Sequence, residues 1–395
     1  MSSFPTAQPA PTEGSAGVAP EPHVPAVVPS PSEMFLDRDH SILAFNERVF
    51  DWACRPDVPL LERLRYLCIV SSNLDEFFEV RAAPHITAAQ SGDHEGACTV
   101  ATCEALMAKA QNLVERQYAL YNDALVPAFA AKGIRIVSHG ERTAEQRRWV
   151  QEYFQREVQP LLIPVGLDPA HPFPLVANKS LNFIVRLKGS DAFGRNNEIA
   201  IVRVPRVLPR VIRMPDRVVA KGSMYVLLSS VIRAHLADLF TGREVTEFSQ
   251  FRVTRHSDLA VDEEDVRNLR TALRKGLQQR HFGQAVRLEV SSSCSPFLAD
   301  FLQSQFGLPS GALFHVHGPV NLVRLSQLVD LVNDPALLFP PWRGAWPVQL
   351  QQSVPILAQL RERDVLIHQP FERFDAVLAF LREAVHDPDV LVIKQ

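Results

Sequence analysis

Five arginines recur every three or four residues in one short stretch of the chain. They are Arg203, Arg206, Arg210, Arg213 and Arg217. The planar guanidinium group can donate two hydrogen bonds at once to phosphate oxygens, so such a row would attract a linear polyanion. Three interspersed prolines exclude a regular helix, so we expect an extended or turning segment. The alternative is a solvated basic edge paired with local acids, and charge chemistry alone does not separate the two.

Other reactive side chains lack the partners that their chemistry needs. None of the 13 histidines has a recognisable base or orienting group nearby in the sequence, so we interpret each as structural or surface. The chain has no Gly-x-x-x-x-Gly-Lys loop, so a P-loop kinase is unsupported. Its five cysteines are odd in number without C-x-x-C spacing, which argues against a disulfide framework or a zinc site.

Helical patterns dominate the first third of the chain. Helical spacing predicts a helix over residues 39–53, a second starting at Pro59, and a long fourth over residues 100–131. A third is predicted to open at Asn73, because Asn73 and Glu76 have the spacing of an N-cap and its capping-box partner. Pro127 should kink the fourth helix, and Gly133 should cap it.

After Gly133 short strand-like runs alternate with helices. Thr143 and Gln146 form a capping-box signature before a helix. Residues rich in Val and Ile predict the strands 181–187, 199–204, 251–254 and 285–290, and helical patterns cover 228–239, 263–279, 296–306 and 320–332. This segment is predicted to be a mixed α+β domain.

The last part of the chain reads as a short helix over 355–361, then a strand–helix–strand unit. Residues 364–369 and 390–394 have the continuous apolar character of buried parallel strands, and residues 374–385 form an amphipathic helix between them. A two-stranded unit leaves its edges uncovered, so we expect a third domain that is cut off soon after it begins.

The amino-acid composition indicates a globular protein. Hydrophobic residues make up 46% and charged residues 22% of 395 residues, as in globular proteins. The net charge of −3 and the lack of interleaved aromatic and basic residues argue against nucleic acid as a partner. No run is long enough for a transmembrane segment, and the Pro- and Ala-rich start predicts a disordered tail. We expect a tail over 1–34, a helical domain over 35–137, an α+β domain over 138–347, and the start of a third domain over 348–395.

Several segments resemble, in the same order, the bacterial polyphosphate kinases of the histidine-phosphorylating type. They are Asp37–Val49, Pro59–Arg81 (which contains S-S-N-L-D-E-F), His171–Asn182, Val204–Arg210, Phe251–Arg255, Phe282–Val290, Gly318–Leu325, Arg361–Phe374 and Asp387–Gln395. The family usually has Trp at the position of Ile42, and Glu and Leu at those of Asp39 and His40. The similarity runs from Phe35 to the end of the sequence.

The resemblance implies a multidomain α and α+β fold with a helical N-terminal domain, an α+β head domain and the start of a phospholipase-D-like α/β domain. It implies reversible transfer of the terminal phosphate of ATP to inorganic polyphosphate through a phosphohistidine, with Mg²⁺. The phosphohistidine and the metal ligands would lie beyond the end of this sequence, so no catalytic residue and no kinase activity are expected of these 395 residues alone. In the family the Asn at position 73 helps hold the nucleotide, so Asn73 becomes a nucleotide-binding candidate, and Arg203, Arg206, Arg210 and Arg213 could bind polyphosphate.

The resemblance also implies partners and a location. ATP or ADP and inorganic polyphosphate are the expected ligands, and a homo-oligomer, a dimer or tetramer, is the expected assembly. The expected location is the cytoplasm, where the protein could associate with a membrane as part of a complex. The alternative function is a non-catalytic polyphosphate-binding or assembly module.

Overall fold

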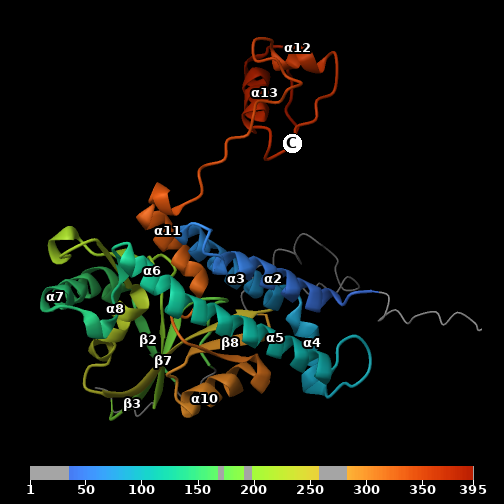
Figure 1. Cartoon of the computed structure of the whole chain (residues 1–395). Coiled ribbons are helices and arrows are strands. Elements are labelled where there is room, and N and C mark those ends of the chain that lie inside the picture. The colour runs from blue at the N-terminus through green and yellow to red at the C-terminus, as the bar shows by residue number, and fades with distance from the viewer. Residues whose placement is uncertain (1–34, 168–172, 191–197, 258–282, 395) are drawn as a thin grey trace, which may run out of the picture.

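Five helices form the first layer of the molecule. The computed structural model describes residues 35–167, 173–190, 198–257 and 283–394, so the predicted tail and the predicted helix 263–279 lie outside the described residues. The five helices are α2 (Arg38–Cys54), α3 (Leu60–Val80), α4 (Ala82–Ser91), α5 (Val100–Ala119) and α6 (Val126–Ala131). Helix α2 packs along α3 (Figure 1), and their contact buries leucine and phenylalanine side chains such as Leu43, Phe50 and Leu64.

Helix α3 is continuous where two helices were predicted, and this corrects the capping assignment of Asn73. Asn73 lies in the interior of α3, more than three turns from its first residue. The buried positions Leu67, Leu74 and Phe78 continue the same apolar face on both sides of the Ser-Ser-Asn run. Burial of that face outweighs the modest helix propensity of serine and asparagine, so the helix does not break there.

The long fourth helix is interrupted as predicted. Its regular part, α5, passes into the π-helical turn η1 (Leu120–Leu125), and α6 begins just before Pro127. Proline has no N–H to donate to the preceding turn, so the ladder of hydrogen bonds widens there. Gly133 follows the helix with φ +77° and donates its N–H to the carbonyl of Ala130, which confirms the predicted C-terminal cap.

Two sheets make up the α+β part. The three-stranded sheet has the order β1 (Ile134–Ile136), β6 (Ser223–Leu227) and β5 (Val211–Arg213). The six-stranded sheet has the order β2 (Ile163–Gly166), β4 (Ile199–Arg203), β3 (Asn182–Lys188), β7 (Glu244–Arg255), β8 (Ala285–Ser291) and β9 (Leu313–Val316). The four predicted strands correspond to β3, β4, β7 and β8, which form the buried centre of the larger sheet.

In the part of the chain that the structure describes, four α-helices accompany the sheets: α7 (Ala144–Tyr153), α8 (Leu228–Ala234), α10 (Pro296–Phe306) and α11 (Ser326–Val332). Both hydrogen bonds of the capping box form at the start of α7, between Thr143 and Gln146. Helix α10 matches its predicted bounds. The predicted order of a helical part followed by a mixed α+β part is therefore confirmed (Figure 1).

The last segment projects from the rest at the end of an extended stretch (Figure 1). Its helices α12 (Ile356–Leu360) and α13 (Asp375–His386) confirm the two predicted helices. The two predicted strands, 364–369 and 390–394, are wrong: neither segment is hydrogen-bonded into a ladder. A strand needs a neighbouring strand to pair its backbone groups, and several apolar side chains here stay in water, with Leu366 81% and Leu391 94% exposed.

Candidate functional site

Asn73 is held by a second asparagine from α2. Its Nδ2 donates to Oδ1 of Asn46 at 3.0 Å, and Nδ2 of Asn46 donates to the carbonyl of Val70 at 3.0 Å. Asn46 is only 2% exposed, so the pair has a fixed, buried end and a half-buried end at Asn73. Among the described residues, Oδ1 of Asn73 has no hydrogen-bond partner, which leaves an acceptor for a ligand.

The arginine row does not form one surface. Arg203, at the end of β4, and Arg206 line a groove of about 320 Å³ with Leu175, Ser180 and Pro205. Arg206 donates to the backbone carbonyl of Asn178. No carboxylate of the described residues lies within ion-pair distance of either arginine, so their charge is available to an anion.

Arg210 is half-buried and turns into a second, much smaller cavity. That cavity, of about 20 Å³, is also lined by Asn321 and Arg324 from the segment before α11. Nη1 of Arg210 is buried without a hydrogen-bond partner, and so is Oδ1 of Asn321. Burial, together with the positive charges of Arg324 and Arg206, lowers the pKa of Arg210 to about 10.

Arg213 separates from the others. Its Nη2 lies 3.4 Å from Oδ1 of Asp216, in an exposed ion pair. The prediction that four arginines act together is therefore not matched by their geometry: Arg203, Arg206 and Arg210 form no ion pair with a described residue, whereas Arg213 has an acid beside it. Arg324 was missed, because it lies more than a hundred residues further along the chain in a segment with no basic run.

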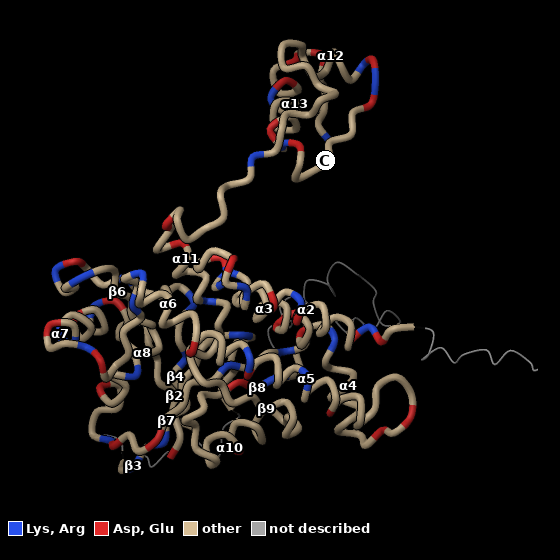
Figure 2. Tube along the Cα trace, in the orientation of Figure 1, with Lys and Arg blue, Asp and Glu red and all other residues tan. Residues whose placement is uncertain are grey.

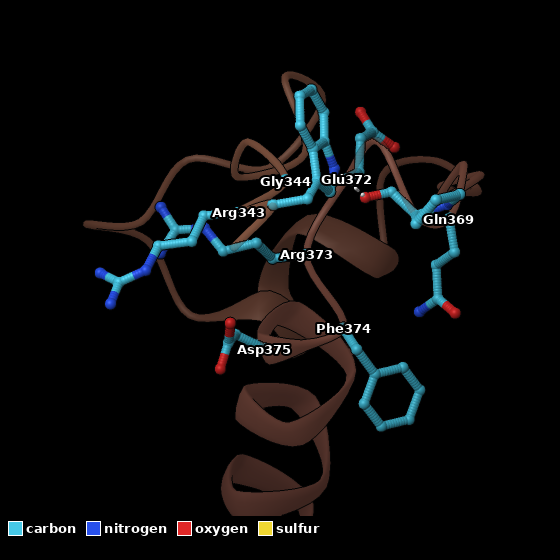
Figure 3. Close-up of a pocket in the computed structure, with 9 residues that line it drawn as sticks. Arg343, Gly344, Gln369, Glu372, Arg373, Phe374 and Asp375 are labelled. Atoms are coloured by element: carbon cyan, nitrogen blue, oxygen red, sulfur yellow. Dashed lines mark hydrogen bonds between the residues drawn. The ribbon is translucent and has the colours of Figure 1, made fainter. Parts of the chain in front are cut away.

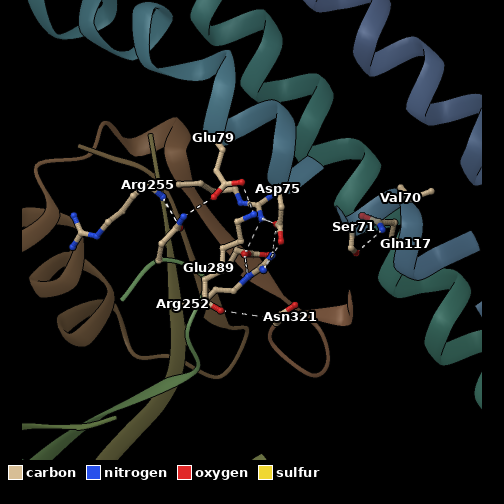
Figure 4. A network of polar contacts seen from close by, with 12 residues as sticks. Val70, Ser71, Asp75, Glu79, Gln117, Arg252, Arg255, Glu289 and Asn321 are labelled. Carbon is tan, nitrogen blue, oxygen red and sulfur yellow. Dashed lines mark hydrogen bonds and ion pairs between the residues drawn. The ribbon is translucent and has the colours of Figure 1, made fainter. Parts of the chain in front are cut away.

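A buried ionic network fixes α3 against the larger sheet (Figure 4). Asp75 of α3 accepts hydrogen bonds from Nη1 and Nη2 of Arg252 on β7, at 2.9 and 2.8 Å, and another from Arg287 on β8. Both arginines also bind Glu289. Burial would raise the pKa of Asp75, but the two guanidinium groups outweigh it and hold the pKa below its usual range.

The end of α3 also holds the loop that supports Arg206. Glu79 accepts from Nδ2 of Asn178 and pairs with Nζ of Lys179, both at 2.5 Å. Its backbone carbonyl accepts the N–H of Ser257 at 2.9 Å. Asn178 in turn accepts from Arg206 through its carbonyl. Helix α3 therefore carries Asn73 and, six residues or about 1.7 turns later, anchors the loop that contacts Arg206.

Asn73 and the arginines are not brought into contact with one another. Asn73 and Asp75 are two residues apart on a helix, so their side chains project about 200° apart, toward α2 and toward the sheet respectively. No hydrogen bond or ion pair joins Asn73 to an arginine of the row in the described part of the chain. The two candidate sites are therefore separate surfaces connected through one helix.

A larger cavity lies in the last segment. It measures about 490 Å³ and is lined by Trp342, Arg343, Glu372, Arg373 and Asp375 among others (Figure 3). Arginine and acidic side chains share its wall, so it has no clear preference for an anion. Across the described trace, Lys and Arg are similarly interspersed with Asp and Glu (Figure 2), which makes the acid-free cluster around Arg210 distinct.

Within residues 35–167, 173–190, 198–257 and 283–394, no three His, Cys, Asp or Glu side chains come together in a way that could hold a metal ion. In the same ranges, every helix is too short or too polar to cross a membrane.

The sequence matches three family models along its length. Residues 35–137 match the polyphosphate kinase N-terminal domain, residues 145–328 the polyphosphate kinase middle domain, and residues 355–395 the polyphosphate kinase C-terminal domain 1.

Individual proteins agree with these matches. A polyphosphate kinase of Neisseria gonorrhoeae is 47% identical over 363 residues, which cover 91% of this chain and 53% of that protein. One of Pseudomonas aeruginosa is 46% identical over 371 residues, covering 92% of this chain and 53% of that protein. The crystal structure of polyphosphate kinase from Porphyromonas gingivalis superposes with a TM-score of 0.72 at 26% identity, over 90% of this chain and 50% of that one. The chain spans about half the length of the curated relatives it matches.

Proposed function

This chain belongs to the polyphosphate kinase family, and we propose that it provides the nucleotide contact and polyanion-attracting surface of an enzyme that transfers the terminal phosphate of ATP to inorganic polyphosphate. The observation that carries the nucleotide part is the Asn46–Asn73 pair. It occupies one N–H of Asn73 and leaves its carboxamide oxygen as an acceptor. The exocyclic amine of adenine is a donor, so the two groups are complementary.

The polyphosphate part rests on the arginines without acidic partners. A polyphosphate chain carries a negative charge on each phosphate, and guanidinium groups bind such oxygens through paired hydrogen bonds. Arg203 and Arg206 line an open groove, and Arg210 lies beyond them in the sequence. Arg213 is left out of this surface because Asp216 already neutralises it.

The chemical step needs groups that the described residues do not supply. Phosphoryl transfer requires a nucleophile and cations that neutralise the charge on the transferring group. The family's phosphohistidine is expected beyond this sequence, and the described residues offer no cluster of ligands for Mg²⁺. We therefore propose that these 395 residues bind substrates and do not by themselves transfer phosphate.

Equilibrium binding of ATP to the purified chain tests the nucleotide contact. Asn73→Ala should weaken ATP binding by about 10-fold, the loss of one hydrogen bond to a ligand of this kind. The matched control is Asn112→Ala, because Asn112 is an exposed asparagine of α5 whose side chain forms no hydrogen bond with a described residue, and the variant should bind ATP like the wild type. Equal ATP affinity in wild type and Asn73→Ala would remove Asn73 from the proposal.

An activity assay on the same protein separates an enzyme fragment from the alternative. Incubation of the chain with ATP and Mg²⁺ should yield no polyphosphate. Polymer formation would show that the 395 residues hold a complete active site and would overturn this part of the proposal. Polyphosphate binding without any ATP binding would instead favour a non-catalytic polyphosphate-binding or assembly module.

The proposal extends to assembly. Polyphosphate kinases resembling this chain are expected to form dimers or tetramers, and we propose the same for the helical and α+β parts described above. Light scattering of the purified chain should give a mass of at least twice 44.2 kDa. A monomeric mass at every protein concentration tested would contradict it.

A further inference from the structure

Arg324 lines the same small cavity as Arg210 although it comes from a different part of the chain, and Arg206 adds a third positive charge that acts on Arg210. We propose that these three arginines and Asn321 form a phosphate-binding subsite, which holds an internal segment of a polyphosphate chain away from its reacting end. The subsite rests on the proposed function and adds to it a residue outside the arginine row and a specific place of binding.

The buried end of Arg210 identifies where a phosphate oxygen would enter. Nη1 of Arg210 has no partner, and a buried donor without an acceptor costs about 1–3 kcal/mol. The base of the side chain is fixed, because Oε1 of Gln327 accepts the backbone N–H groups of Arg210 and Val211 at 2.7 and 3.1 Å. Among the described residues, no acceptor lies within hydrogen-bond distance of Nη1, at the far end of this anchored residue.

The size of the cavity decides how much of the ligand it can take. A volume of about 20 Å³ admits a single oxygen atom or one water molecule, but not a whole phosphate group. One phosphate oxygen would thus reach Arg210, while the rest of the group stays at the mouth. Arg324 lines the cavity and is itself exposed, so it can bind the remaining oxygens.

The electrostatics favour an anion with more than one charge. Arg206, Arg210 and Arg324 form no ion pair, so three like charges stand together without compensation in the described part of the chain. A single water between Arg210 and Oδ1 of Asn321 would satisfy both atoms, but it would leave these charges opposed. Rotation of the Asn321 amide would give up only a 3.5 Å contact to the Lys179 carbonyl and present a donor to the phosphate.

The neighbouring groove indicates the path that a bound polyphosphate chain would follow from the subsite. Arg206, four residues before Arg210 in the sequence, lines the groove of about 320 Å³ that contains Arg203. A chain with a phosphate at Arg210 could therefore continue past Arg206 to Arg203. Orthophosphate and tripolyphosphate fill only part of this path, so the subsite should favour long chains.

Binding of long-chain polyphosphate to the purified chain tests the subsite. Arg324→Gln should weaken binding about 10-fold, as expected for the loss of a charge-assisted contact, and should reduce the dependence of binding on salt. The control is Arg213→Gln, which removes the same charge from an exposed, already paired position and should change binding by less than about twofold. ATP affinity should be unchanged in both variants.

Each possible result bears directly on the proposed subsite. Equal losses in Arg324→Gln and Arg213→Gln would mean that only net charge counts, and would overturn the subsite. No loss in Arg324→Gln, or no binding by the wild type, would also overturn it, while the Asn73 experiment would still judge the proposed function. An equal loss for a single-stranded RNA of matched charge would assign the surface to polyanions in general. Because Arg210→Gln alters a buried group, Arg206→Gln serves as the second exposed variant and should act like Arg324→Gln.

Discussion

Asp75 of α3 and Arg252 of β7 form a two-pronged ion pair inside the molecule, 177 residues apart in sequence. Both side chains are nearly inaccessible to water, and Arg287 and Glu289 complete the arrangement. Two acids thus face two arginines, so the buried charges compensate one another. This contact fixes the helix that carries Asn73 against the sheet.

Removal of one acid from this network should be strongly destabilising. Asp75→Asn leaves two guanidinium groups facing a single carboxylate, and breaking a buried pair in this way costs about 3–5 kcal/mol. Urea unfolding at neutral pH measures the difference. The control is Asp57→Asn, which breaks the exposed pair of Asp57 with Arg55 and should change stability little, because water and salt screen that pair. Similar effects of the two substitutions would contradict the assigned importance of the network.

Asp39 should make stability depend on pH in acid. Burial would raise its pKa, but hydrogen bonds from Arg81 and His85 lower the pKa below its ordinary value. The unfolded chain therefore binds the proton first, and the stabilisation is complete above pH ~4 and lost as pH falls through the folded-state pKa.

Asp39→Asn tests this dependence. At neutral pH the substitution should cost about 1.5–3 kcal/mol, as for hydrogen bonds to a charged group. The difference from wild type should shrink as the pH is lowered, when followed by urea unfolding across a pH series. Asp123→Asn is the control, because Asp123 is exposed and forms no ion pair within the described part of the chain. A difference that stays constant with pH would rule out ionisation of Asp39 as its source.

Gly222 should tolerate no side chain. It has φ +77°, and a Cβ there would lie 2.2 Å from the carbonyl oxygen of Gly133, at the start of the parallel β1–β6 pair. Gly242 has φ +80° with nothing within 4 Å of its Cβ position. Gly242→Ala should therefore cost only the ~1–2 kcal/mol of a left-handed backbone, whereas Gly222→Ala should add roughly 1–3 kcal/mol for the clash. Thermal unfolding of both variants provides the comparison, and equal shifts would show that the two strands can move apart without cost.

Asn46 should affect nucleotide binding without touching the nucleotide. Asn46→Ala removes the acceptor that orients the Asn73 amide, so ATP should bind more weakly, by up to the same factor as in Asn73→Ala. The double variant should be no weaker than Asn73→Ala alone, because both changes remove one interaction. Binding is measured below the unfolding temperature of the least stable variant. Additive losses would indicate that Asn46 acts independently of Asn73.

Local patterns in the sequence predicted the parts of the fold that local forces determine. The capping box at Thr143, the interruption of the fourth helix at Pro127, and the Val- and Ile-rich strands at the centre of the larger sheet each depend on a few neighbouring residues. The Ser-Ser-Asn run was misjudged for the opposite reason: a cap signal is worth about 1 kcal/mol, less than burial of the leucines and phenylalanines around it.

The remaining features depend on partners that are distant in sequence. The short strands β1, β5 and β6 have three to five residues each, too few for a periodic pattern. Nothing near Arg324 indicates that it meets Arg210, and nothing near Asp75 indicates Arg252. The two apolar segments 364–369 and 390–394 were wrongly predicted as strands from their composition. Strand-like composition does not provide the neighbouring strand that a strand requires.

Because α3 is continuous, the distance along it between Asn73 and Glu79 is fixed. Asn73 and Glu79 are six residues apart in one unbroken helix, which corresponds to about 9 Å of rise along its axis. Glu79 holds the loop that contacts Arg206. The residue proposed to bind adenine and the loop beside the proposed phosphate site are therefore attached to the same continuous helix. A kink at Asn73, as the capping pattern had suggested, would have made that spacing variable; the straight helix makes it a constant of the fold.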